Sequence, residues 1–246
     1  MLFRSASASL LGRPDVGLLT GTEMAGHAAR LAAAVSAPLI ADADTGYGNA
    51  LNVIRTVQLY QDAGAAGMFL EDQVWPKRCG HMAGKQVVER NDWLSKLRAA
   101  VHAADGLHVT ARTDARAAIG LDEALERGRM ARDVGVDAVF VEAPESLAEL
   151  ERIVTVLPDV TLVANMVETG RTPLLTRDEL ERLGFGLVLS PLTGLFSTVR
   201  AMRDSFALLR SEGSLRDHLG RLVDFDDFGS IVGLPEHRGL DEQFRP

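Results

Sequence analysis

The sequence has little of what stabilises extracellular or membrane proteins: among 246 residues there is a single cysteine, with two tryptophans and two tyrosines. One cysteine cannot form an internal disulfide, and no Cys/His pairs have zinc-finger spacing, so we expect a reducing, cytoplasmic setting. No apolar run approaches the roughly 20 residues of a membrane helix. No secretory signal precedes the first predicted helix, so we expect no membrane association.

Basic residues are in the minority, with 26 Lys and Arg against 34 Asp and Glu and a formal net charge of −8. Because nucleic-acid phosphates are bound by clustered Lys and Arg, this balance argues against a nucleic-acid partner. Hydrophobic residues make up 46% of the chain, which is ample for a core and argues against disorder. An acidic chain can still bind a small acid in a locally basic, metal-bearing cleft.

Short apolar or β-branched runs alternate with longer amphipathic segments along most of the chain. The runs predict six strands, at 38–42, 67–71, 108–112, 137–142, 160–164 and 186–190. Apolar spacings of three and four predict helices at 21–35, 51–63, 93–104 and 121–134, the first opened by a Thr20/Glu23 capping box. A longer helical stretch follows at 194–212. Strand, helix, strand repetition indicates right-handed βαβ units and a parallel sheet.

Polar side chains lie where the predicted strands end. Asp42, Glu71, Arg112 and Glu142 close four runs, and Asn165 follows a fifth. In a (β/α)8 barrel the carboxyl ends of all strands meet in one mouth, whereas an open doubly wound sheet concentrates its site near one switch point. Periodicity alone permits both folds, and the spread of polar residues over many strand ends favours the barrel.

The first candidate site is the segment 41–49, Ala-Asp-Ala-Asp-Thr-Gly-Tyr-Gly-Asn. Asp42 and Asp44 stand one residue apart at a strand end, and the two glycines would let the backbone approach a ligand closely. Hard carboxylate oxygens with no His or Cys pair nearby are typical of Mg²⁺ or Mn²⁺ bound partly through water. A lone Asp-x-Asp pair is more often an ordinary loop, so this motif alone does not decide.

The second candidate site is the loop at 71–85, which carries the only cysteine, Cys79. Lys77, Arg78 and His81 surround it, and neighbouring cations lower a thiol's pKa and favour proton transfer. A lone cysteine is usually a small buried hydrophobe, but these basic neighbours favour a reactive thiol. His81 taken alone fits a functional and a structural role equally well.

Several motifs occur in one order along the chain. They are Gly-Arg-Pro-Asp at 12–15, Asp-Ala-Asp-Thr-Gly-Tyr-Gly at 42–48, Glu-Asp-Gln at 71–73, Lys-Arg-Cys-Gly-His at 77–81, Ala-Arg-Thr-Asp at 111–114, Glu-Ala at 142–143, Asn-Met-Val-Glu at 165–168 and Thr-Pro at 172–173. Together they resemble the isocitrate lyase/phosphoenolpyruvate mutase superfamily. The resemblance implies a (β/α)8 TIM-type barrel with Mg²⁺ at its mouth, in homotetramers whose last helix packs on a neighbouring subunit.

The resemblance also implies roles for individual residues. Asp42, Asp44, Glu71 and Asp15 would hold the metal directly or through water. Arg112 would bind a substrate carboxylate as a two-pronged donor, its alternative role being an ion pair to Asp114 or Glu142. The remaining assignments are catalytic roles for Cys79, Lys77, His81, Glu71 and Tyr47, and substrate-binding roles for Glu142, Asn165 and Gly80.

The loop around Cys79 resembles that of the carbon–carbon lyases in the superfamily rather than that of the phosphonate mutases. The implied reaction is Mg²⁺-dependent cleavage of a 2-hydroxy diacid, a 2-alkylmalate or 2-methylisocitrate-like di- or tricarboxylic acid, to pyruvate or glyoxylate plus a carboxylate. Cys79 would supply the proton, and Tyr47, Glu71 and His81 remain candidates for the base. Oxaloacetate hydrolysis or decarboxylation, carboxyphosphonoenolpyruvate phosphonomutation, and an inactive fragment or noncatalytic binding module remain alternatives.

The front of the chain departs from the superfamily's pattern. Members begin with two strands and a helix before the loop that carries Asp15, which here follows only fourteen residues. We therefore expect one barrel domain over 1–246 that lacks the first two strands and the first helix. We also expect residues 1–5 to be non-native and 194–246 to form C-terminal helices that swap between subunits. A barrel without two adjacent strands would have exposed edges.

Overall fold

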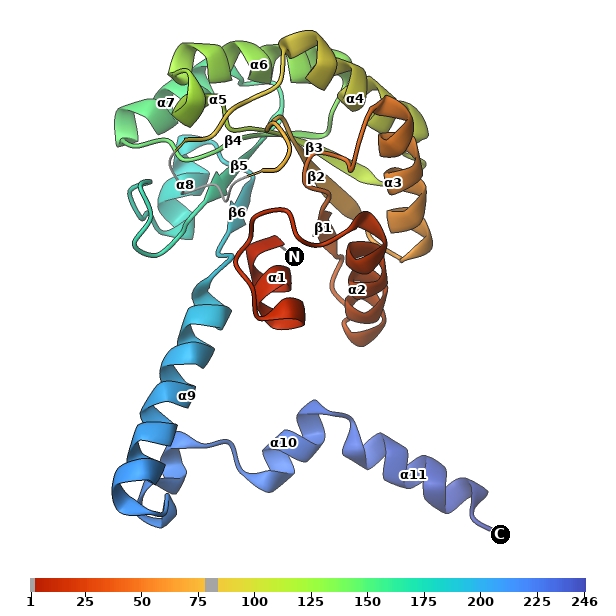
Figure 1. Cartoon of the computed structure of the whole chain (residues 1–246), viewed down its shortest axis with the longest axis vertical. Coiled ribbons are helices and arrows are strands. Elements are labelled where there is room, and N and C mark those ends of the chain that lie inside the picture. The colour runs from red at the N-terminus through yellow and green to blue at the C-terminus, as the bar shows by residue number, and fades with distance from the viewer. Residues whose placement is uncertain (1–2, 78–83) are drawn as a thin grey trace. The chain divides into compact units, whose positions relative to one another are not determined.

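The computed structural model describes residues 3–77 and 84–246 and divides into two units, Met1–Thr193 and Gly194–Pro246. The first unit contains a six-stranded parallel sheet whose spatial order follows the chain, so each strand pairs with the next one in sequence. Figure 1 shows this sheet curved into part of a barrel. The strands are β1 (Ile40–Asp42), β2 (Gly67–Glu71), β3 (His108–Thr113), β4 (Ala138–Val141), β5 (Thr161–Asn165) and β6 (Leu187–Leu189).

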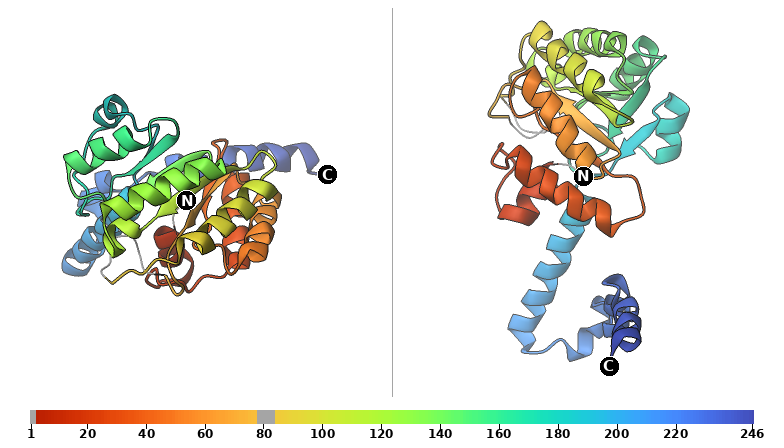
Figure 2. Two further views of the ribbon diagram at one scale, coloured as in Figure 1. Left: turned by 90° about the horizontal axis from the view of Figure 1, so that it is seen from above. Right: turned by 90° about the vertical axis from the view of Figure 1, so that its right-hand side faces the viewer.

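Helices connect successive strands and cover the convex side of the sheet, a layering that Figures 1 and 2 show from three directions. The helices of this unit are α1 (Phe3–Leu11), α2 (Gly21–Ala34), α3 (Ala50–Asp62), α4 (Arg90–Ala103), α5 (Ala115–Ala118), α6 (Leu121–Val134), α7 (Leu147–Val156) and α8 (Arg177–Leu183). The capping box at the start of α2 is present: the Thr20 side chain accepts from the Glu23 backbone, and the Glu23 carboxylate accepts from the Thr20 backbone.

The sequence-based prediction of the fold is confirmed. All six predicted strands and the helices between them form within a few residues of the expected bounds, and the strands make a partial barrel of the expected type. Within the described residues, β1 and β6 form the two edges of the sheet. The first helix was not predicted; it packs near the end of β6, where the Ser5 hydroxyl donates to the Pro191 carbonyl at 3.0 Å.

Alternation along the strands sorts their side chains onto two faces. Phe69 of β2, Phe140 of β4 and Val163 of β5 form one cluster, in which the two phenyl rings meet edge to face with centroids 6.1 Å apart. Their chain neighbours Met68, Leu70, Val139, Val141, Leu162 and Ala164 belong to the larger core. Because successive side chains of a strand point to opposite faces, the first cluster fills the concave side and the larger core lies under the helices.

The same alternation positions the polar residues at the strand ends. Glu71 lies two residues beyond Phe69, Glu142 two beyond Phe140, and Asn165 two beyond Val163. A spacing of two keeps a side chain on the same face of the strand. The polar side chains therefore continue the inward-facing rows of the apolar cluster to the carboxyl ends of the strands.

Backbone strain concentrates in the loop that follows β1. Asp44 and Tyr47 have positive φ angles of 48° and 58°, although neither is glycine. Gly46 has φ of +86°, and a Cβ atom placed there would lie 2.4 Å from Cγ2 of the buried Val53. Strained residues persist where their surroundings hold them in place. This loop is fixed by β2, because Ala43 donates to the Phe69 carbonyl at 2.9 Å and Glu71 donates to the Asp44 carbonyl at 2.8 Å.

The second unit consists of helices with little buried surface. It comprises α9 (Thr193–Glu212), a short 3₁₀ helix (Arg216–Arg221), α10 (Phe225–Ile231) and α11 (Leu234–Phe244). Helix α9 begins one residue before the unit does. Phe225, Ile231 and Phe244 are each more than 70% exposed. Across both units, no helix within 3–77 and 84–246 is both long and apolar enough to cross a membrane.

We predict that Gly46→Ala destabilises the protein more than Gly106→Ala does. Both glycines have positive φ, which costs an alanine about 1 kcal/mol or more. Only Gly46 would add a steric overlap, with Val53, worth about another 2 kcal/mol; no heavy atom lies within 4 Å of the Cβ position at Gly106. Urea unfolding of the two variants measures the difference, and equal losses would contradict the close packing described here.

Candidate active site

The polar side chains at the strand ends meet at the mouth of the partial barrel. Arg112 Nη1 lies 3.4 Å from Glu71 Oε2, and Arg112 Nε lies 3.9 Å from Glu142 Oε2. Asn165 Nδ2 donates to Glu142 Oε2 at 3.3 Å. Asp42 is buried beside them at the end of β1. The structure thus brings together five of the residues that the sequence predicted for one site.

Lys77 places a buried ammonium group between two of the predicted metal ligands. Its Nζ lies 2.5 Å from Asp15 Oδ1 and 2.9 Å from Asp44 Oδ1. Burial disfavours the ammonium form, but the carboxylates of Asp44 and Glu71 outweigh that effect and raise the pKa of Lys77. Lys77 is therefore a cation that neutralises part of this carboxylate group.

The carboxylates next to Lys77 are short of hydrogen-bond donors. Asp44 Oδ2 and Glu71 Oε1 are buried without a hydrogen-bond partner. Burial raises the pKa of Asp44 to about 8, against the attraction of Lys77, and repulsion from Asp42 adds to the rise. Burial likewise raises the pKa of Glu71, which Arg112 opposes. Buried carboxylate oxygens are costly unless a donor or a cation satisfies them.

This donor set fits a magnesium ion. Asp42, Asp44, Glu71 and Asp15 offer only hard oxygen atoms, which Mg²⁺ prefers, and some of those oxygens lack partners. In the part of the chain that the structure describes, no three His, Cys, Asp or Glu side chains converge as a ready ligand cluster. Mg²⁺ is usually held by only one or two carboxylates and keeps several waters, so a converged cluster is not required.

Tyr47, a candidate base, lies in a different environment. Its hydroxyl is 3.4 Å from that of Tyr60, which in turn donates to the Asp42 carbonyl at 2.6 Å. Burial, followed by the neighbouring Tyr60, raises the pKa of Tyr47 well above its ordinary value. The phenol therefore keeps its proton at neutral pH, whereas the carboxylate of Glu71, the other described candidate, lies 3.4 Å from Arg112 Nη1.

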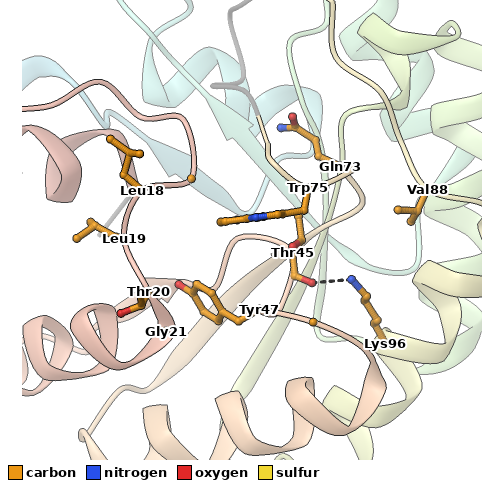
Figure 3. A pocket seen from close by; sticks show the side chains of 12 residues that line it. Leu18, Leu19, Thr20, Gly21, Thr45, Tyr47, Gln73, Trp75, Val88 and Lys96 are labelled. Atoms are coloured by element: carbon orange, nitrogen blue, oxygen red, sulfur yellow. Dashed lines mark hydrogen bonds between the residues drawn. The ribbon is translucent and has the colours of Figure 1, made fainter.

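The Tyr47 ring lines a side cavity of about 580 Å³ next to the mouth (Figure 3). Leu18 and Leu19 of the loop before α2 form one wall, and the Trp75 ring projects between them and Val88. Lys96 at its edge donates to the Thr45 carbonyl at 2.9 Å. The cavity wall is mainly apolar, unlike the charged mouth.

A buried ion network that includes Arg112 is the part of the site that the sequence did not predict. Asp114 accepts from Arg112 and from Lys85, and Asp72 accepts from Arg127. The pair between Arg112 and Asp114 was expected only as an alternative to substrate binding. For Asp72 and Asp114, the sequence feature that could have indicated a place in the site is their position: Asp72 directly follows Glu71, and Asp114 follows Arg112 by two residues. Nothing in the sequence marked Lys85 or Arg127 as buried.

Three predicted residues of the second candidate site, Cys79, Gly80 and His81, lie outside the described residues, in 78–83. Their roles therefore remain predictions. Of that loop, the structure places Lys77 at one end and Lys85 at the other, and both side chains are buried.

Comparison with known proteins identifies the family. Residues 4–210 match the family model described as phosphoenolpyruvate phosphomutase. A 2,3-dimethylmalate lyase of Eubacterium barkeri is 45% identical over 97% of this chain and 83% of its own length. A chloroplastic carboxyvinyl-carboxyphosphonate phosphorylmutase of Arabidopsis thaliana is 47% identical over 97% of this chain and 72% of its length. A 2-methylisocitrate lyase of Halalkalibacterium halodurans is 39% identical over 89% and 76%.

Solved structures of related enzymes are similar to this chain along nearly its whole length. An oxaloacetate acetylhydrolase in complex with the inhibitor 3,3-difluorooxalacetate matches with a TM-score of 0.93 and 35% identity, over 99% of this chain and 83% of that one. A phosphonopyruvate hydrolase in complex with oxalate and Mg²⁺ matches with a TM-score of 0.86 and 30% identity, over 98% and 84%. The named lyases among these relatives support a carbon–carbon lyase, and the chain belongs to the phosphoenolpyruvate mutase/isocitrate lyase superfamily.

Proposed function

We propose that the protein is a Mg²⁺-dependent lyase that cleaves a 2-hydroxy diacid, a 2-alkylmalate or a 2-methylisocitrate-like acid, to pyruvate or glyoxylate plus a carboxylate. One observation carries the proposal: the buried guanidinium of Arg112 faces Glu71 and Glu142 beside buried carboxylate oxygens that lack donors. A cation site next to an anion-binding arginine is what a chelating hydroxy acid requires.

Arg112 is suited to bind one carboxylate of the substrate. A guanidinium offers a planar pair of donors that match a carboxylate, and Arg112 is held rigid by its neighbours and by the Phe140 ring, 5.3 Å from its central carbon. Glu142 and Asn165 would line the same pocket. Because Glu142 already accepts from Asn165, its carboxylate has a fixed orientation.

Asp42, Asp44, Glu71 and Asp15 would hold Mg²⁺, directly or through water. The chemistry that the ion supplies is Lewis-acid polarisation of the 2-hydroxyl and its carboxylate, with stabilisation of the negative charge that develops on the oxo acid. Lys77 would offset part of the negative charge of this cluster through its ion pairs to Asp15 and Asp44.

Cleavage requires one proton to leave and another to arrive. A base removes the proton of the 2-hydroxyl, the electron pair of that O–H bond forms the carbonyl of the oxo acid, and the adjacent carbon–carbon bond breaks. The bond's electron pair passes to the departing fragment, an aci-carboxylate, which takes a proton from the Cys79 thiol. Glu71 is the candidate base that the described geometry favours, with His81 the alternative.

Oxaloacetate hydrolysis remains a second candidate, because an oxaloacetate acetylhydrolase is a close structural relative. Both reactions break a carbon–carbon bond next to an oxygen-bearing carbon and use the same anion-binding groups. A panel of 2,3-dimethylmalate, 2-methylisocitrate and oxaloacetate separates them, with lactate dehydrogenase detecting the released oxo acid and a separate assay detecting acetate. Activity on none of these acids in the presence of Mg²⁺ would overturn the proposal.

We also propose that the second unit packs against other copies of the chain in a homotetramer. The observation in its favour is the large exposed apolar surface of Phe225, Ile231 and Phe244, which is unusual for an isolated monomer.

We predict that Cys79→Ser lowers the rate of cleavage by about a hundredfold or more, because a serine hydroxyl is a much weaker acid than a thiol. Steady-state assays on the best acid of the panel measure the loss. Binding of Mn²⁺, followed by electron paramagnetic resonance, should be unchanged in the variant. Retained turnover would exclude Cys79 as the proton donor.

A second prediction concerns the metal site. Asp44→Asn should weaken Mn²⁺ binding by on the order of a hundredfold, because a charged ligand oxygen is lost. Chelation with EDTA should abolish turnover of the wild-type protein, and added Mg²⁺ should restore it. Asp62→Asn, which removes the same charge from the exposed end of α3, is the matched control and should leave Mn²⁺ binding unaltered.

A third prediction tests the assembly. Light scattering after size-exclusion chromatography should give the mass of a tetramer for the wild-type chain. Replacing the exposed Phe225 and Ile231 together with serine should reduce that mass, because the apolar surface is the driving force. A wild-type monomer would contradict the proposed assembly without bearing on the chemistry.

A further inference from the structure

We propose that Lys85 is a positioning residue, which acts through Asp114 to fix the edge of the Arg112 guanidinium that is presented to the substrate. The inference rests on the proposed function, in which Arg112 binds a substrate carboxylate. Lys85 itself touches no reacting atom in this scheme. Its side chain is only 1% exposed, and its ammonium contacts Asp114, the carboxylate that Arg112 also contacts.

Asp114 and Glu71 occupy different donors of the Arg112 guanidinium. Nε donates to Asp114 Oδ2 at 3.0 Å, and Nη2 donates to Asp114 Oδ1 at 3.2 Å. This pair occupies the Nε/Nη2 edge of the guanidinium. Nη1 lies 3.4 Å from Glu71 Oε2, which is longer than an ordinary hydrogen bond. The edge formed by Nη1 and Nη2 is therefore the one available to a carboxylate at the mouth.

Asp114 is held in place by Lys85 and Asp72. Lys85 Nζ contacts Asp114 Oδ1 at 2.5 Å, on the same oxygen that accepts from Arg112 Nη2. The backbone of Asp114 donates to Asp72 Oδ1 at 2.8 Å, and Thr113 Oγ1 donates to Asp72 Oδ2 at 2.6 Å. Both the side chain and the backbone of Asp114 are therefore restrained, the side chain by Lys85 and the backbone by Asp72.

Lys85 also balances part of the negative charge that surrounds Arg112. Arg112 faces the carboxylates of Glu71, Asp114 and Glu142. Burial disfavours the charged form of Asp114, but Arg112 and Lys85 outweigh it and lower its pKa. Because Lys85 shares the negative charge of Asp114, Arg112 is not left as the sole compensation for that charge. Without Lys85, Asp114 would compete more strongly with a substrate carboxylate for the guanidinium.

The backbone segment that carries Lys85 is held in place by hydrogen bonds. The segment that carries Lys85 pairs with the chain after β2: Val74 donates to the Gln86 carbonyl and Val88 to the Asp72 carbonyl, each at 2.9 Å. Arg127 of α6 fastens the same segment, donating to the Val88 carbonyl at 2.8 Å and to Asp72 Oδ2 at 3.1 Å. The Lys85 side chain therefore extends from a restrained backbone, and a residue that positions another side chain needs such a restraint.

The test compares three variants of the full chain in the presence of Mg²⁺. Oxalate, a dicarboxylate seen in complex with a relative, is the binding probe, measured by calorimetry. Lys85→Met should weaken oxalate binding about tenfold and raise KM for the substrate by a similar factor, with a smaller change in kcat. Lys85→Arg, which keeps the cation, should recover most of the loss. Arg116→Met, which breaks ion pairs to Glu145 and Glu149 away from Arg112, should lower stability without weakening oxalate binding.

The outcomes are distinct. If wild-type protein binds oxalate and Lys85→Met binds it equally well, Lys85 is structural and this inference is wrong. If wild-type protein fails to bind oxalate, the role of Arg112 fails, and the inference fails with it. Where Lys85→Met does not fold, Lys85→Gln replaces it; the amide retains a donor but no charge, and it should show the same weakened binding. Equal losses for Lys85→Arg and Lys85→Met would also overturn the inference.

Discussion

The site depends on the inward-facing rows of a curved parallel sheet. Four of the six strands, β1, β2, β4 and β5, place an apolar side chain on the concave face and a polar one two residues later, at the carboxyl end. Phe69 of β2 and Phe140 of β4 meet edge to face under the mouth, and β3 with Arg112 lies between these two strands. A shift of one residue in any strand would turn its polar group into the core under the helices. The register of the strands therefore determines where the charged side chains of the site lie.

This arrangement has an energetic cost, because it gathers charges where water is excluded. Burial raises the pKa of Asp44 and Glu71, and only Lys77 and Arg112 offset it. Replacing buried ion pairs with apolar side chains often stabilises a protein, so such clusters are weak arguments for stability. Their arrangement beside strained residues such as Asp44 is better explained by ligand binding.

Much of the fold was predictable because it rests on local periodicity. The strand runs and helix spacings gave the element order, and polar residues at successive strand ends identified Asp42, Glu71, Arg112, Glu142 and Asn165 as one group. The network of Asp72, Lys85 and Arg127 was not predictable in this way. A lysine or arginine in a sequence is usually exposed, and its burial depends on a carboxylate far along the chain: Arg127 and Asp72 are 55 residues apart. Tyr47 was assigned to catalysis from its motif, but its contact with Tyr60 depends on how α3 packs.

The two lysines connect the halves of the site. Lys77 is fixed on the carboxylates that would hold the metal, and Lys85 is fixed on the carboxylate that orients Arg112. The predicted proton donor, Cys79, lies between them in sequence, so Lys77 and Lys85 on either side of it contact groups that are proposed to bind ligands. A divalent cation bound to Asp15 and Asp44 would compete with the Lys77 ammonium for the same oxygens, because two positive charges at such short range repel strongly in a buried site. Metal binding would therefore be coupled to the position of Lys77, which lies two residues before Cys79 in the sequence.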